Sequence, residues 1–189
     1  MAKTYRTPGV YIEEVNAFPG SVVTVETAIP AFIGYTQKAT RNKKSLINSP
    51  VRITSLKEYK ELFGFGNMPK FKLVPDSTGE EHSVKIADKE IGIHYVLNTK
   101  LFFFNSIRLF YANGGGTCYI VSVGTFDEDG EVELRKVDFE RGLKTLEKEQ
   151  EPTMVVVPDA VKLDVDECYA FYGKVLGHCA KMQSRVAIF

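Results

Sequence analysis

The chain has 189 residues, with 24 basic and 24 acidic side chains, so its formal net charge at neutral pH is zero. This length suits one domain that buries roughly 70% of the surface its unfolded form would expose. Balanced charge gives no general attraction for nucleic acid, anionic lipid or an acidic substrate. The chain starts without the apolar run of a secretory signal, and no apolar stretch approaches the roughly 20 residues of a membrane-spanning helix. We therefore expect synthesis in the cytoplasm, with no nucleic-acid partner and no membrane insertion.

The first thirty-five residues read as three extended segments, and the first of them, TPGVYIEEV, stands apart from any obvious core. Its β-branched and aromatic residues favour a strand. Breakers at Pro8-Gly9 and Pro19-Gly20 separate it from the neighbouring segments. We expect residues 1–20 to form an extended arm, which is well suited to pairing with a strand of another chain.

From residue 28 onward, apolar runs alternate with amphipathic segments. Near-continuous apolar runs, typical of strands covered on both faces, occupy residues 31–36, 118–123, 153–158 and 185–189. Helical spacing occupies residues 56–63, about 99–112 and 138–148, and a last helix that begins after Asp164 as its cap. The apolar stripe of this last helix is Cys168, Tyr172, Val175, Cys179 and Met182. The alternation predicts an α/β domain over residues 21–189, with a mostly parallel sheet and helices on both faces.

Two stretches interrupt this rhythm. Residues of about 64–98 are rich in turn formers and contain a short meander, so we expect a surface insertion there. Residues 125–136 predict a hairpin with Asp129-Gly130 at its turn. The final strand, RVAIF, ends at Phe189 with no helix after it, so we expect either another chain or a longer polypeptide to cover its apolar surface.

Glycines and acidic residues that could bind ligands do not fit known sites. Asn113-Gly114-Gly115-Gly116 follows a helix and precedes a strand, the reverse of a phosphate loop, so we expect a left-handed helix cap. Gly64-Phe65-Gly66 has the same interpretation. The run from Asp127 to Glu131 lacks calcium-loop spacing, because its glycine comes fourth and its twelfth position is Asp138, expected to cap a helix.

The metal-binding and nucleophilic residue types are scattered as well. Cys118, Cys168 and Cys179 have no zinc or disulfide spacing, and we expect the last two to be core residues. His82, His94 and His178 share no ligand spacing. Asp159 is the one ionisable residue expected where the parallel strands end. We therefore predict no catalytic residue, no metal and no cofactor.

Two parts of the chain together resemble the sheath proteins of contractile bacteriophage tails and of related injection particles. They are TPGVYIEEV followed by SVVTVETAIPAFIGYT, and LFYANGGGTCYIVSV. The likeness covers most of the chain apart from about residues 67–98. Sheath proteins are generally longer, so it implies that this chain is the amino-terminal portion. It also implies a mechanical, non-enzymatic subunit that polymerises around an inner tube and contracts. The implied inter-subunit arm residues are Val10, Tyr11, Ile12, Glu13, Val15, Val22, Val23 and Val25, with hinges at Pro8, Gly9, Pro19 and Gly20.

The resemblance also implies partners and a location. The partners are further copies of the chain, an inner tube protein, baseplate and terminator proteins, and sheath paralogues. The protein would be part of a tail or tail-like particle that can be released from the cell. The alternative is an α/β enzyme or small-ligand binder whose first strand pairs inside its own domain.

Overall fold

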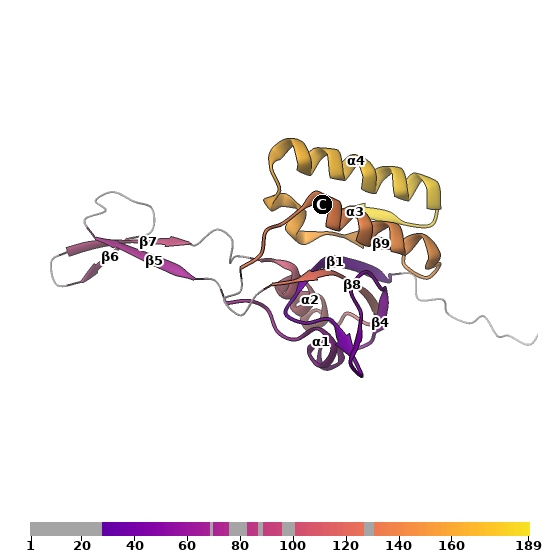
Figure 1. Ribbon diagram of the computed structural model, residues 1–189, viewed down its shortest axis with the longest axis horizontal. Coiled ribbons are helices and arrows are strands. Elements are labelled where there is room, and N and C mark those ends of the chain that lie inside the picture. Colours follow the sequence, from indigo (N-terminus) through magenta and orange to yellow (C-terminus); the bar gives the residue numbers. More distant parts are fainter. Residues whose placement is uncertain (1–27, 69, 76–82, 87–88, 96–100, 127–130) are drawn as a thin grey trace, which may run out of the picture.

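The computed structural model describes residues 28–68, 70–75, 83–86, 89–95, 101–126 and 131–189. Its main sheet has five strands in the order β10-β9-β1-β8-β4 (Figure 1). Their bounds are β1 Pro30–Thr36, β4 Val51–Ile53, β8 Cys118–Thr125, β9 Met154–Val156 and β10 Val186–Ile188. Each of the four apolar runs of the sequence contributes a strand, so these four strand predictions are confirmed.

Strand β1 is the centre of the molecule. All seven of its residues are buried, as expected for a continuous apolar run. It runs parallel to β8 on one side and to β9 on the other, with Ile33 opposite Val121 and Ala31 opposite Val155. β10 extends the parallel part of the sheet beyond β9.

The helices form close to their predicted positions. Their bounds are α1 Leu56–Phe63, α2 Phe103–Ala112, α3 Lys136–Thr145 and α4 Val165–Met182, with 3₁₀ turns η2 Leu146–Lys148 and η3 Pro158–Lys162. Ser55 starts α1, because its side chain accepts the backbone N–H of Glu58. Gly114, with φ 81°, follows α2 in the expected left-handed conformation.

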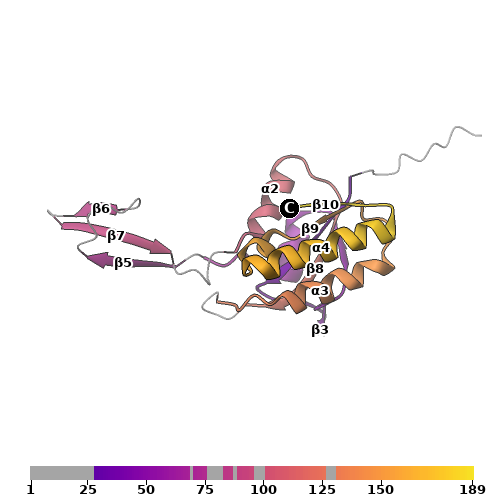
Figure 2. The ribbon, with the colours of Figure 1, turned by 90° about the horizontal axis from the view of Figure 1, so that it is seen from above.

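Two apolar cores lie on opposite faces of the sheet. One contains Ile33, Val121, Phe139 and Phe171 and is covered by α3 and α4. The other contains residues of α1 and α2 together with Phe32 and Ile120. Figure 2 shows α4 and α3 side by side over the sheet.

The predicted fold class, a mostly parallel sheet with helices on both faces, is wrong for this chain. The main sheet is mixed, because β4 pairs antiparallel with β8. Two further sheets are antiparallel: β2 (Thr40–Arg41) with β3 (Lys44–Ser45), and the insertion sheet β5-β7-β6. Strand β4, a three-residue segment, was not predicted, because it is too short to show a hydrophobic period.

The insertion sheet consists of β5 Phe71–Pro75, β6 Ser83–Ile86 and β7 Lys89–Tyr95. β6 and β7 form the predicted meander. β5 was not predicted, because its two ends, Phe71 and Pro75, lie in stretches identified as rich in turn formers. The hairpin predicted over residues 125–136 is wrong in its described part, since residues 131–135 form no strand.

We predict that Gly142→Ala, in α3, destabilises the protein. An added Cβ would lie 2.5 Å from Val123 Cγ1 and 2.9 Å from Ile33 Cγ2. Overpacking of this kind costs about 1–3 kcal/mol. Gly177→Ala in α4 is the control, because its added Cβ meets nothing within 4 Å. It should be neutral or stabilise by up to about 1 kcal/mol through helix propensity. Urea unfolding of both variants checks the difference, and equal stabilities would contradict the packing of α3 on the sheet.

Candidate functional site

The carboxyl ends of the parallel strands β1, β8 and β9 lie on one side of the sheet, where an α/β protein would bind a ligand. The polar side chains there bond to the protein itself. Thr36 Oγ1 and Ser122 Oγ lie 2.7 Å apart, and Thr36 also donates to the carbonyl of Lys38. Gln37 Oε1 accepts the backbone N–H of Phe65 at 2.8 Å. These side chains therefore hold the backbone of Lys38 and Phe65 next to the ends of the strands.

Asp159, the ionisable residue predicted at the carboxyl ends of these strands, is fully buried in η3. Its Oδ1 accepts the backbone N–H of Phe102 at 2.6 Å. Because no side chain of its own caps α2, Asp159 supplies the cap from 57 residues away. Burial raises the pKa of the carboxyl to about 6, although the N–H groups of Phe102 and Phe103 act in the opposite direction. The geometry is that of a structural helix cap.

A second buried carboxylate lies at the start of α3. Asp138 accepts the Tyr35 hydroxyl at 2.8 Å and forms ion pairs with Arg135 at 2.9 Å and Arg141 at 3.2 Å. Burial and this hydrogen bond raise the pKa of Tyr35 to about 12. The expectation that Asp138 caps a helix is wrong, because α3 starts at Lys136 and places Asp138 in its first turn. The carboxylate instead ties α3 to the end of β1.

Cysteine and histidine side chains are dispersed through the described part of the chain. Cys118 and Cys168 are buried and Cys179 is half-buried, so the core prediction holds best for Cys168. His94 is exposed on β7, while His178 is buried beside Arg185. Within the described ranges, no three His, Cys, Asp or Glu residues come together as a metal site. His82 and the acidic run from Asp127 lie partly or wholly outside those ranges.

The outer edge of β10 has the geometry of a strand-pairing site. β10 is the last strand in the sheet order, and no other described strand pairs with its outer side. The N–H of Val186 donates to the carbonyl of Thr153, so Val186 points its backbone groups toward β9. Since alternate residues of a strand point to opposite edges, Ala187 directs its N–H and C=O outward. Val186, Ile188 and Phe189 around it are exposed apolar residues.

Arg185 holds this edge in place. Its guanidinium donates to the carbonyls of Leu146 at 3.1 Å and Glu149 at 2.6 Å, where the α3–η2 segment ends. It also lies 3.3 Å from Nε2 of His178, and burial lowers the pKa of both side chains. Gln183, with φ 55°, ends α4 and turns the chain into β10. The start of β10 is thus attached to the end of the α3–η2 segment and to α4.

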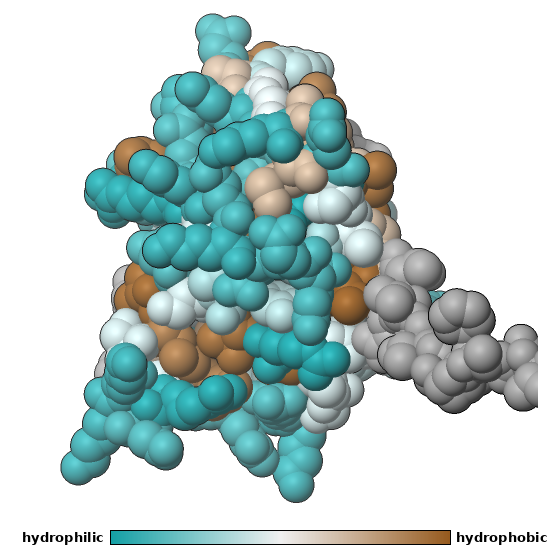
Figure 3. Space-filling view, turned by 90° about the vertical axis from the view of Figure 1, so that its right-hand side faces the viewer, coloured by the Kyte–Doolittle hydropathy of each residue, from teal (hydrophilic) through white to brown (hydrophobic). Residues whose placement is uncertain are grey.

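Helix α4 flanks the same edge. The rings of Tyr172 and Phe189 lie 4.0 Å apart, so the residue after β10 packs on α4. Figure 2 shows β10 running alongside α4. Figure 3 shows one end of the molecule, where polar residues cover most of the surface and apolar residues form a few separate patches.

The predicted arm and hinge residues all lie in residues 1–27, outside the described part of the chain, so their pairing stays a prediction. Sequence reasoning noted the apolar residues 185–189 and the surface they would expose. It missed Arg185, because an arginine before an apolar run carries no signal of burial. No described helix is long and apolar enough to cross a membrane.

We predict that Asp159 makes stability depend on pH. Its pKa is higher in the folded chain than the ordinary 3.8, so folding disfavours the ionised form. The wild type should therefore lose stability relative to Asp159→Asn as pH rises from about 4 through 6, by about 3 kcal/mol at most. Urea unfolding of both proteins at pH 4.5 and 7.5 measures this difference. Asparagine is chosen because its side-chain oxygen can still accept the N–H of Phe102. If the difference in unfolding free energy between the two proteins is the same at both pH values, the buried cap is contradicted.

Comparisons with known proteins assign no family to this chain. No protein-family model matches it, and no curated protein matches it.

Proposed function

We propose that this chain is a structural subunit of a contractile sheath, which polymerises helically around an inner tube by exchanging strands between copies. The observation that carries the proposal is the anchored β10 edge, where Ala187 presents backbone groups to a further strand. The likeness of residues 7–36 and 109–123 to sheath proteins supports the same function. In this proposal the arm Val10–Val15 of a neighbouring copy is the added strand.

The energetics of such pairing suit an assembly of many copies. By alternation, Arg185, Ala187 and Phe189 direct backbone groups outward, which allows about two to four hydrogen bonds with an added strand. At about 0.5–1.5 kcal/mol each, these bonds contribute roughly 1–6 kcal/mol. Apolar side chains of the arm would add burial against Val186 and Ile188. A contact of this strength is reversible alone and becomes stable when repeated through a lattice.

Contraction would result from the same connections. The breakers at Pro8-Gly9 and Pro19-Gly20 would let the body of each subunit rotate while its arm stays paired. The free energy would come from assembly in a metastable extended state, without a nucleotide. The further partners would be the inner tube protein, the baseplate and terminator proteins, and sheath paralogues. The subunit would be made in the bacterial cytoplasm and become part of a phage tail or tail-like particle.

We predict that Ala187→Pro abolishes polymerisation while the subunit stays folded. Proline removes the outward N–H but leaves the bond between Val186 and Thr153, and proline is tolerated on edge strands. Wild-type protein should form straight, striated tubes in electron micrographs, and Ala187→Pro should form none, with a thermal unfolding midpoint close to that of wild type.

Two controls complete this test. Ala187→Ser keeps the N–H at the same position and should retain tubes. Deletion of residues 1–18 should leave a folded monomer that does not polymerise. Tubes formed by Ala187→Pro as readily as by wild type would exclude the β10 edge. Unfolding of the deletion variant would instead place the first strand in its own core, as in the enzyme or ligand-binder alternative.

A further inference from the structure

The insertion sheet is amphipathic. Residues directly opposite in antiparallel strands share a face, and Leu73 pairs with Ile93 while Val84 pairs with Ile91. The resulting apolar face includes Leu73, Val84, Ile86, Ile91 and Ile93, with Lys89 at one end. The opposite face carries more polar side chains, although Val74 lies there opposite Gly92. Lys72 lies opposite His94, Lys85 lies opposite Glu90, and the Ser83 hydroxyl donates to Glu90 at 2.7 Å.

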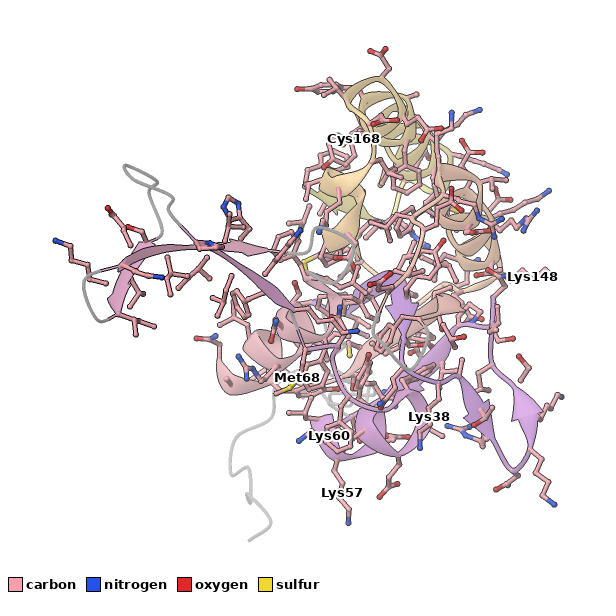
Figure 4. All side chains as sticks on the ribbon, turned by 60° about the vertical axis from the view of Figure 1, so that its left-hand side comes forward. Lys38, Lys57, Lys60, Met68, Lys148 and Cys168 are labelled. Carbon is pink, nitrogen blue, oxygen red and sulfur yellow. The ribbon has the colours of Figure 1, made fainter. Side chains whose placement is uncertain are left out.

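The apolar face has no second layer in the part of the chain that the structure describes. Leu73 is 61% exposed and Ile86 is 55% exposed. Neither core cluster contains a residue of β5, β6 or β7. Figures 1 and 4 show the three strands projecting from the body of the molecule. A sheet with one apolar face needs another layer against it, and an exposed apolar patch of this kind marks an interaction surface.

Helix α4 carries an exposed apolar stripe that matches this face in length. Val165, Tyr169 and Leu176 lie at i, i+4 and i+11, which places them on one side of the helix, and each is more than half exposed. Eleven residues of helix span about 17 Å, as does a strand of five residues. The α4 stripe also adjoins the β10 edge, because Tyr172 lies between its members and packs on Phe189. In Figures 1 and 2 the insertion sheet points away from the body, so the two surfaces lie apart within one copy.

We propose that the apolar face of the insertion sheet packs on the α4 stripe of a second copy of this chain. The choice of partner rests on the proposed function, in which copies assemble side by side. Contact between two different surfaces of one chain is heterologous and continues from subunit to subunit. Contact between two identical faces would instead create a two-fold axis and reverse the direction of the next subunit, which a one-directional helical tube does not allow.

The size of the contact predicts how it behaves. Three strands about 4.8 Å apart and about 17 Å long cover roughly 240 Å² per partner. Both sides together bury roughly 500 Å², well below the approximately 1,200 Å² of a stable isolated interface. The free protein should therefore not dimerise through this contact. Within a polymer, strand pairing at the adjoining β10 edge raises the effective concentration of the two surfaces and makes the contact persist.

Crosslinking tests the pairing directly. The variant Leu73→Cys/Tyr169→Cys is assembled and treated with a short bis-maleimide, and peptide mapping identifies the joined residues. The expected product joins position 73 of one copy to position 169 of another. The single variants control for reaction with Cys168 and Cys179. A product joining position 73 to position 73, or no product between copies, would overturn the proposal.

A charge placed on each face in turn gives the second test. Ile86→Lys puts a charge on the apolar face and should reduce the yield of tubes at least tenfold. Ser83→Lys puts the same charge on the opposite face of the same strand, beside Glu90, and should leave the yield unchanged. Equal yields from both variants would overturn the proposal.

The two proposals can fail separately. If the variant Leu73→Cys/Tyr169→Cys forms tubes as wild type does but gives no product joining positions 73 and 169, the sheath function stands and this contact is excluded. A protein that forms no tubes, but gives that product between copies at high concentration, would exclude the sheath function and leave this contact standing.

Discussion

Complete burial of β1 is the constraint on which the rest of the structure depends. Every residue of this strand is covered, so its backbone must pair on both sides and its side chains must pack on both faces. The parallel strands β8 and β9 satisfy the first requirement, and the two apolar cores satisfy the second. Close packing leaves little room: Gly34 and Gly142 lie so near Phe103 and Val123 that neither could carry a Cβ without displacing them.

The edges of the sheet differ in a way that bears on function. At one edge, β4 runs antiparallel to its neighbour β8. At the other, β10 is parallel, apolar and anchored through Arg185 to the end of the α3–η2 segment. Proteins usually protect sheet edges with short strands, charges or bulges. β10 is as short as β4, at three residues, but it is apolar and anchored. An anchored edge suits addition of a strand, because the position of its backbone is already determined before a partner arrives.

Buried polar groups and exposed apolar surfaces have different places in the described part of the chain. The buried carboxylates Asp159 and Asp138 each bond to groups that hold helices in place, and the polar groups at the strand ends bond to nearby backbone. By contrast, the β10 edge, the α4 stripe and the insertion sheet combine exposed apolar side chains with regular secondary structure. A subunit that exchanges strands and packs one surface on a different surface of its neighbour would need these three features together.

The sequence alone determined the type and place of most helices and strands. Apolar periodicity is a local property, so α1 and the strands β1, β8, β9 and β10 could be recognised from their own residues. The arm was also predicted from the sequence alone, and it stays a prediction because residues 1–27 lie outside the described part of the chain. Tertiary structure alone decided the direction of β4, the capping of α2 by Asp159, the contacts of Asp138 and the burial of Arg185. Most of these features join residues between 39 and 103 positions apart, and no short-range pattern encodes which distant group a side chain will meet.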